Sequence, residues 1–291
     1  MHHKKRTISM LYCRYILSIL AVLLSFTALQ GQIISPTRNE VLNVDSVKEA
    51  FDKAPYFGLY KDNYFIFGPA IGMKPTEYNT NVKFQISVSQ RLTKRTLPLG
   101  SYLYLFYTQK CFWDVLRKSF PMTDLNFNPG IGLTKPLFVK DRFIGKASLI
   151  FEHESNGRDG DDSRSWNRIS FAGNILIDPT MMIHGKIWIP IVDGENNRDL
   201  LNYYGLYQFG ITYMTLTKRL VGSIILTKRK GWNPFNFNTI LEFSYKLFNN
   251  ENQYLFVQYY NGYGEGLLDY KVFKSQLRVG ICIKPQFFSE Y

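Results

Sequence analysis

Apolar and polar residues alternate one by one in short stretches of the chain from residue 56 onwards. Leu277, Val279, Ile281 and Ile283 interleave with polar or small residues, and the same pattern occurs around Phe84. A period of two places every second side chain on the same face of an extended strand, so each stretch predicts a strand with one apolar and one polar face. The other predicted strands cover residues 103–109, 131–135, 147–155, 167–177, 184–192, 204–213, 223–228, 239–247 and 253–260.

Breaks rich in Asn, Asp, Gly and Pro separate the predicted strands, for example at residues 193–197, 231–234 and 249–252. A soluble sandwich of two sheets would also alternate, but it buries its apolar faces and needs no export signal. A membrane barrel shows its apolar face to lipid and closes on itself, because an unpaired strand edge cannot be solvated in hydrocarbon.

The first 31 residues have the pattern of an export signal. A basic start ends near Arg14, an apolar run covers residues 15–29, and Gln30-Gly31 follow. The alternative is an uncleaved anchor, since the apolar run approaches the length of a short spanning helix. We expect residues 1–31 to be a cleaved signal peptide, residues 32–55 an N-terminal periplasmic arm with a short helix at 41–54, and residues 56–291 a barrel.

Composition favours strands over helices as the spanning elements. Aromatic residues make up 16% of the 291 residues and the apolar share is 45%, whereas the mean hydropathy of −0.16 is too low for a bundle of apolar spanning helices. The roughly 235 residues after the arm, at about 20 per strand and connection, give about twelve strands. The predicted fold is all-β, an antiparallel transmembrane β-barrel of about 12 strands.

Charge and cysteine content exclude two classes of protein. Four positive charges lie in the first fourteen residues, so the formal charge of +12 falls to +8 without them, and most of the remaining Lys and Arg alternate with apolar residues. No nucleic-acid partner is therefore expected. Three cysteines without CxxC spacing, one of them inside the leader, exclude a disulfide framework and structural zinc.

Residues 147–158 carry the most informative chemistry. In an extended strand His153 and Ser155 share the face of Leu149 and Phe151, and in the following strand Asn167 shares the apolar face. Polar groups facing lipid are costly unless they bond one another. A Ser hydroxyl, a His imidazole and an Asn carbonyl together form a nucleophilic relay, in which the Asn orients the His. The alternative is a pair of interfacial polar residues satisfied by water.

These residues resemble the bacterial outer-membrane phospholipase A family. The segment His153-Glu-Ser-Asn-Gly-Arg158, followed by Ser163-Arg-Ser-Trp-Asn-Arg168, is similar to that family's signature. Further similar segments occur in the same order along nearly all of the chain after the leader, at residues 63–64, 82–87, 107–110, 262–270 and 278–280.

The resemblance implies a twelve-stranded barrel with Ser155 as nucleophile, His153 as general base and Asn167 as the residue that orients His153. It also implies a Ca²⁺ ion bound by the main-chain oxygen of Arg158 and the hydroxyl of Ser163, with Ser119 of a second subunit as a further ligand. The backbone N–H of Gly157 would help stabilise the oxyanion. Gln109, on the lipid-facing row, would bond its twin across the interface of a homodimer.

The function that this resemblance implies is a calcium-dependent phospholipase of the Gram-negative outer membrane, activated by homodimerisation. It would hydrolyse acyl esters of membrane phospholipids, of the A1 or A2 type, and release fatty acid and lysophospholipid. Two alternatives remain: a non-enzymatic barrel that is a pore or a structural protein, and a lipid A deacylase. Glu154, where the family commonly has Gln, is expected to point into the barrel, and Cys111 is interpreted as structural.

Overall fold

A computed structural model describes residues 56–93, 97–139, 142–191, 195–248 and 252–285. The predicted signal peptide, residues 1–31, and the predicted arm, residues 32–55, lie outside the described residues. Within the described residues no helix combines the length and the apolar character needed to cross a membrane.

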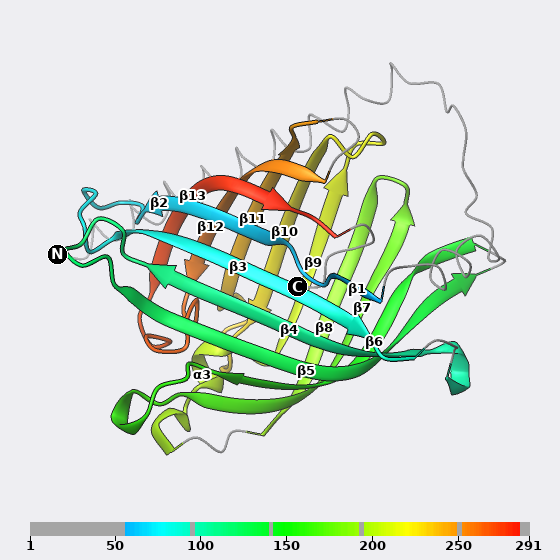
Figure 1. Cartoon of the computed structure of the whole chain (residues 1–291), viewed down its shortest axis with the longest axis horizontal. Helices are drawn as coiled ribbons and strands as arrows, with labels where there is room; N and C mark the ends of the chain where they lie inside the picture. The colour runs from blue at the N-terminus through cyan, green and yellow to red at the C-terminus, as the bar shows by residue number, and fades with distance from the viewer. Residues whose placement is uncertain (1–55, 94–96, 140–141, 192–194, 249–251, 286–291) are drawn as a thin grey trace. The chain divides into compact units, whose positions relative to one another are not determined.

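The described residues form one closed antiparallel sheet (Figure 1). β1 (Phe57–Leu59) and β2 (Asn63–Pro69) pair with successive parts of β3 (Thr80–Arg91), so together they occupy one position in the wall. β13 (Lys274–Ile283) pairs with β2 and closes the barrel. The remaining strands are β4 (Tyr102–Trp113), β5 (Met122–Val139), β6 (Arg142–Ser155), β7 (Ser165–Asp178), β8 (Met181–Ile191), β9 (Tyr207–Met214), β10 (Leu220–Lys228), β11 (Phe237–Lys246) and β12 (Gln253–Gly262). The twelve-stranded antiparallel barrel predicted from the sequence is confirmed.

The two ends of the barrel differ in their connections. The end at which β6 finishes carries long loops at residues 70–79, 114–121, 156–164, 229–236 and 263–273, whereas β7 and β8 are joined at the other end by residues 179–180. The short helices η2 (Gly160–Asp162), η3 (Glu195–Asn197) and α3 (Leu201–Tyr204) also lie at the long-loop end. In outer-membrane barrels the long loops face outwards, so we name this end the outer rim.

Alternation produces an apolar exterior and a polar interior. On β8 the side chains of Ile183, Ile187 and Ile189 are exposed, whereas His184 and Lys186 between them are buried inside the barrel. Bilayer hydrocarbon covers such an outer face, and the backbone polar groups pair within the closed wall. The strand pattern read from the sequence thus assigned the two faces correctly.

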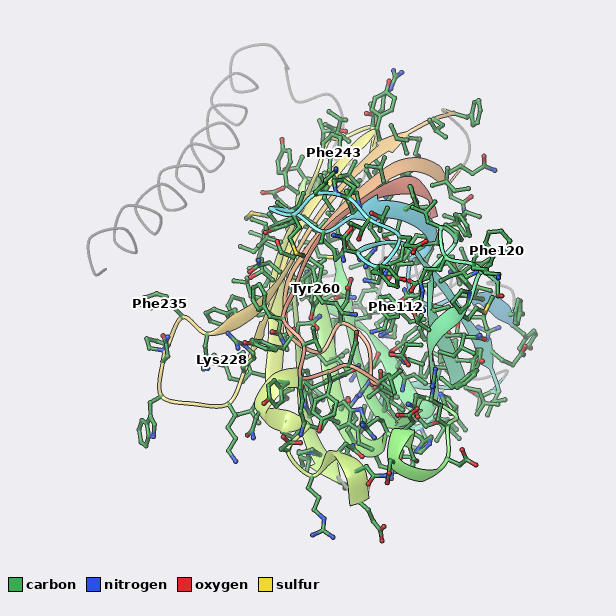
Figure 2. The ribbon with its side chains drawn as sticks, turned by 90° about the vertical axis from the view of Figure 1, so that its left-hand side faces the viewer. Phe112, Phe120, Lys228, Phe235, Phe243 and Tyr260 are labelled. Atoms are coloured by element: carbon green, nitrogen blue, oxygen red, sulfur yellow. The ribbon has the colours of Figure 1, made fainter. Side chains whose placement is uncertain are left out.

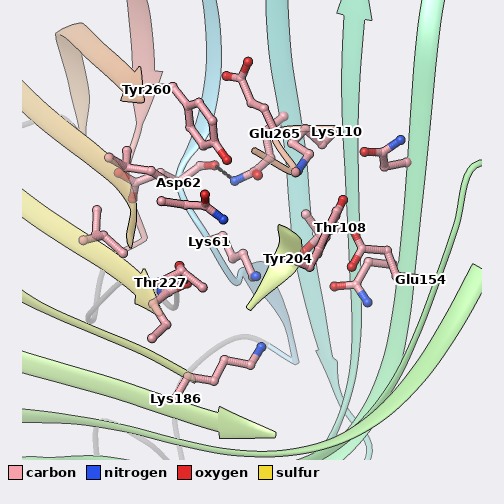
Figure 3. A pocket seen from close by; sticks show the side chains of 18 of the residues that line it. Lys61, Asp62, Thr108, Lys110, Glu154, Lys186, Tyr204, Thr227, Tyr260 and Glu265 are labelled. Atoms are coloured by element: carbon pink, nitrogen blue, oxygen red, sulfur yellow. Dashed lines mark hydrogen bonds between the residues drawn. The ribbon is translucent and has the colours of Figure 1, made fainter. Parts of the chain in front are cut away.

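The interior is filled at both ends and hollow between them. Near the inner end, buried apolar side chains pack as one cluster: Tyr64, Ile66, Met182, Met214, Val221, Tyr254, Phe256 and Cys282. At the outer rim Leu200 and the two loop residues Leu267 and Tyr270 pack against Trp166. A polar cavity of about 220 Å³ lies inside the barrel, where Lys61, Lys186 and Tyr204 line it (Figure 3).

Some strand boundaries differ from those predicted. Tyr204 belongs to α3 instead of a strand, because Gly205 follows with φ of +95° and β9 begins only at Tyr207. The first half of β5 was not predicted: its outward row contains Thr123 and Pro129, so apolar alternation is weak there although the ladder to β4 continues. β1 and β2 were not predicted as strands. In β2 the inward-facing Tyr64 and Ile66 are apolar like the outward-facing Phe65 and Phe67, so no apolar–polar alternation is visible.

Candidate active site on the outer wall

The strands β6 and β7 place the three predicted catalytic residues at the outer rim. His153 lies directly opposite Asn167 in the antiparallel register, and Ser155 lies opposite Ser165. All of these side chains are half-buried, while Phe151, the next outward residue on β6, is exposed. The site therefore lies at the end of the lipid-facing row, on the outside of the wall, as the alternation predicted.

A hydrogen bond joins His153 to Asn167, with 2.8 Å between Nδ1 of the ring and Oδ1 of the amide. A carbonyl oxygen only accepts, so Nδ1–H is the donor, and Nε2 of the neutral ring is left as an acceptor. This is the tautomer that a general base needs in order to take a proton from a serine hydroxyl. Ser155 supplies such a hydroxyl two residues further along the same face.

An ionic network on the inner face of the same hairpin fixes its register. The guanidinium of Arg168 contacts Oε2 of Glu152 at 2.5 Å and Oε2 of Glu154 at 2.7 Å. Lys186 on β8 binds the other oxygen of Glu152 at 2.6 Å, and the indole N–H of Trp166 donates to Glu154 at 3.1 Å. All these groups are buried, where fully hydrogen-bonded charges hold one geometry. The expectation that Glu154 points into the barrel is confirmed.

The loop of residues 156–164 folds around the buried side chain of Asn156. Its Oδ1 accepts the backbone N–H groups of Arg164 at 3.0 Å and Arg158 at 3.4 Å, and its Nδ2 donates to the carbonyl of Asp162 at 2.8 Å. Gly157 has φ of +65°, and a Cβ at this position would lie 2.9 Å from the ring of Phe127. Only glycine therefore fits this turn without strain or displacement.

The predicted calcium ligands Arg158 and Ser163 lie in this same loop. A main-chain oxygen and a hydroxyl are hard ligands of the kind that Ca²⁺ prefers, and Asp161 and Asp162 add exposed carboxylates beside them. Asp162 also binds the Arg158 guanidinium at 3.2 Å, which leaves the main-chain oxygen of Arg158 unaffected. In the described part of the chain no group of three or more His, Cys, Asp or Glu residues could hold a metal. The donor chemistry of the loop thus fits a calcium site completed by oxygen atoms from elsewhere.

Ser119 lies in the neighbouring loop, residues 114–121, at the same rim. Ser119 and Phe120 both have positive φ, +68° and +44°, and both are exposed. The indole of Trp113 holds the turn by donating to the carbonyl of Phe120 at 2.9 Å. The Arg158 guanidinium also donates to the carbonyl of Thr123 at 2.7 Å, so the loop of residues 156–164 is bonded to the start of β5, directly after the loop that carries Ser119. Within this one chain Ser119 is presented outwards to solvent.

Gln109 lies on the outward row of β4, opposite Ile86 and Phe127 on its two neighbours. The Tyr107 hydroxyl donates to Oε1 of Gln109 at 2.9 Å, and Nε2 of Gln109 lies 3.4 Å from the sulfur of Cys111. One lone pair of the carbonyl and one N–H therefore remain for an outside partner. Cys111 is buried and is a free thiol, not part of a disulfide.

The sequence reasoning missed the two residues that support the site from behind. Asn128 donates from Nδ2 to the carbonyl of His153 at 2.8 Å, and Asn156 organises the loop. A signal did exist for the inner network, since the polar faces of the two strands carry opposite charges, Glu152 and Glu154 on one and Arg168 on the other. Nothing in the alternation distinguished Asn156 from an ordinary loop residue.

Comparison with known proteins gives one consistent result. Residues 60–283 match the model of the family described as Phospholipase A1. The chain is 30% identical over 215 residues to Phospholipase A1 of Escherichia coli strain K12, covering 71% of this chain and 70% of that protein. It is 29% identical over 212 residues to Phospholipase A1 of Proteus vulgaris, covering 71% and 70%.

Two solved structures share the fold. Outer membrane phospholipase A from Escherichia coli superposes with a TM-score of 0.69 at 26% identity, over 79% of this chain and 99% of that one. The outer membrane phospholipase of Salmonella typhi, a dimer with bound calcium, gives the same TM-score and identity over 82% and 97%.

Proposed function

This chain belongs to the Phospholipase A1 family, and from that premise we propose that it is a calcium-dependent serine hydrolase activated by homodimerisation. The chain is an outer-membrane phospholipase, a carboxylic ester hydrolase in a twelve-stranded barrel. The proposal concerns the groups that carry out the hydrolysis. The observation that supports it best is the hydrogen bond from His153 Nδ1 to Asn167 Oδ1 on the outer wall.

In the proposed reaction Ser155 Oγ attacks the carbonyl carbon of an acyl ester while Nε2 of His153 takes the hydroxyl proton. The backbone N–H of Gly157 stabilises the oxyanion that forms. Collapse breaks the ester C–O bond, and His153 returns its proton to the departing lysophospholipid oxygen. Water then attacks the acyl-serine by the same route, which releases the fatty acid and restores Ser155.

The position of the site explains the choice of a neutral orienting residue. Asn167 lies on a lipid-facing row, where an unpaired carboxylate would be expensive to desolvate. An amide oxygen holds the ring tautomer without a net charge. Because the site opens at the wall and not into the interior cavity, a phospholipid reaches Ser155 by lateral movement in the bilayer. The cavity lies on the opposite face of β6 and β7 and has no part in the reaction.

The proposed calcium ion would be held by the main-chain oxygen of Arg158 and the hydroxyl of Ser163. When bound, it supplies positive charge that favours an oxyanion near Gly157. Ser119 completes the ligand set from a second subunit in this proposal, and Gln109 uses its remaining hydrogen-bonding capacity across the interface. Support comes from the exposed position of Ser119 and from the Salmonella typhi relative, which is described as a dimer with bound calcium.

Phospholipid hydrolysis by the refolded full barrel in detergent tests the proposal. Ser155→Ala is expected to abolish fatty acid release, and chelation of calcium to lower it strongly. Ser165→Ala is the matched control, because this serine lies opposite Ser155 in the register and should tolerate the change. Hydrolysis by Ser155→Ala at the wild-type rate would refute the nucleophile assignment, and a fully active enforced monomer would refute the roles of Ser119 and Gln109.

The N-terminal assignments remain proposals of the same kind. Residues 1–31 are proposed to be removed on export, and residues 32–55 to form the periplasmic arm. The mass of the mature protein from the outer membrane tests the cleavage. The family match favours a phospholipase over the pore and the lipid A deacylase, and a substrate panel with positional acyl labels distinguishes A1 from A2 cleavage.

A further inference from the structure

Residues 229–236, which join β10 to β11 at the outer rim, present two uncovered aromatic side chains. Trp232 is fully exposed and Phe235 is 85% exposed. Figure 2 shows this loop projecting sideways from the barrel wall, with Lys228 at its base and Phe235 near its tip. Large apolar side chains held away from the rest of a protein mark an interaction surface.

Hydrogen bonds within the loop hold it in this projecting form. The Lys228 ammonium donates to the carbonyl oxygens of Arg229 at 2.7 Å and Gly231 at 3.3 Å, and to Oδ1 of Asn236. The Asn236 amide donates to the carbonyl of Lys230 at 3.0 Å. The loop satisfies its backbone with its own side chains, so presenting the aromatic pair requires little further ordering.

The charge of the loop is of one sign. Lys228, Arg229 and Lys230 are consecutive, and residues 229–236 contain no acidic residue. The Arg229 guanidinium lies over the ring of Tyr263 at 4.9 Å, whereas Lys230 is exposed. The surface complements a negatively charged partner.

The loop continues the lipid-facing wall. Phe209 and Phe243, on the strands next to it, are exposed on the outer face, and Phe209 packs edge-on against Phe237 at the start of β11, 5.8 Å between centroids. A surface that begins in the lipid belt and ends in aromatic residues beside lysine matches the layered chemistry of a bilayer interface.

We propose that residues 229–236 dock on the anionic headgroup layer of the membrane that holds the barrel. Trp232 and Phe235 insert at the boundary between headgroups and acyl chains, and Lys230 lies among lipid phosphates. The inference depends on the barrel spanning a bilayer and not on the proposed catalytic groups, so either can fail without the other.

A fluorescent probe at position 232 tests the docking. In a Cys13→Ser background the two remaining cysteines are buried, so an environment-sensitive dye attached to Trp232→Cys labels the loop alone. Glu195→Cys, exposed at the same rim, is the matched control. In vesicles of equimolar phosphatidylcholine and phosphatidylglycerol, spin-labelled lipid is expected to quench the probe at 232 several-fold more than the probe at 195. Aqueous iodide should show the reverse order.

The lipid charge and the loop residues are then varied. Pure phosphatidylcholine vesicles, or Lys230→Gln, should weaken quenching by lipid, and added inorganic phosphate should leave it unchanged. The double variant Trp232→Ala/Phe235→Ala should still hydrolyse a soluble ester in detergent. When the purified variant is added to preformed anionic vesicles, it should bind them several-fold more weakly than the wild-type protein does. Equal iodide access at 232 and 195 overturns the proposal. Equal quenching of the probe at 232 in the mixed and in the pure phosphatidylcholine vesicles also overturns it. So does a probe that is shielded from iodide but not quenched by spin-labelled lipid, because that result indicates a protein partner.

Discussion

Replacing Asn167 by alanine removes the acceptor that orients His153 while the nucleophile and base stay in place. The lost contact is the 2.8 Å bond from Nδ1 to Oδ1. The imidazole becomes positively charged when it takes the serine proton, so the relevant bond in the transition state is one to a charged group, about 1.5–3 kcal/mol. At about 1.4 kcal/mol per tenfold in rate, kcat should fall roughly 10- to 150-fold. The fold should persist, since this bond lies on the outer face and the Arg168 network inside remains.

Initial rates of fatty acid release from phospholipid micelles at saturating calcium measure this loss. Heat-modifiability on gels verifies that each variant is folded. Asn167→Asp keeps an oxygen acceptor and should retain more activity than Asn167→Ala, while Ser165→Ala should match wild type. If Asn167→Ala stays within a few-fold of wild type and Ser155→Ala is inactive, His153 does not need Asn167, and the orienting role assigned to the bond is wrong.

Three further predictions concern the support of the site and the outer rim. Arg168→Met should lower the free energy of unfolding by about 3–5 kcal/mol, measured by urea titration in detergent, because the buried carboxylates Glu152 and Glu154 lose their shared partner; no destabilisation would refute this. Gly157→Ala should fold but hydrolyse phospholipid more slowly, since its Cβ would lie 2.9 Å from the Phe127 ring at a positive φ; an unchanged rate would contradict this. Burial raises the pKa of Asp199, but hydrogen bonds from Tyr270 and Lys271 outweigh it and hold the pKa below its usual range. The Asp199 carboxylate joins the segment before β9 to the loop of residues 263–273. The stability that this contact adds is fully present above the ordinary pKa of a carboxyl group and is lost as the pH falls through the lowered pKa of Asp199. The protection factors of the amides at residues 197–204, which correct for the intrinsic pH dependence of exchange, should therefore fall in acid, and Asp199→Asn should remove that fall; protection factors with the same pH dependence in both proteins would refute it.

The alternation of side chains predicted most of the fold because closure of a barrel imposes it on every strand. Leu277 to Ile283 of β13 and Ala147 to Ser155 of β6 were both read correctly, and both have one lipid-facing row. The pattern failed where a strand departs from this rule. β2 is apolar on both faces, the outward row at the start of β5 is interrupted by Pro129, and α3 ends at Gly205 before β9 begins at Tyr207.

The sequence also predicted that the side chains of the candidate site share the outward face of their strands, since residues two apart on a strand point to the same side. The direct pairing of His153 with Asn167 depends on the register between β6 and β7, which a single strand's pattern does not contain. The role of Asn156 was equally hidden, because it arises from three backbone groups of a folded loop. Resemblance to a family supplied the candidate residues, and the structure supplied their geometry.

The two faces of the hairpin β6–β7 carry different polar groups: ion pairs on the inner face and a hydrogen-bonded pair of side chains on the outer face. Inside, Glu152, Glu154 and Arg168 carry full charges and compensate one another at distances below 3 Å. Outside, His153 and Asn167 satisfy one another through a single hydrogen bond, which lowers the cost of placing polar groups on a lipid-facing surface. Both faces belong to the same pair of strands, β6 and β7. The ion pairs on the inner face therefore fix the register that places His153 opposite Asn167 on the outer face. Changes to the inner network should therefore alter hydrolysis through geometry, even though none of its side chains reaches the lipid.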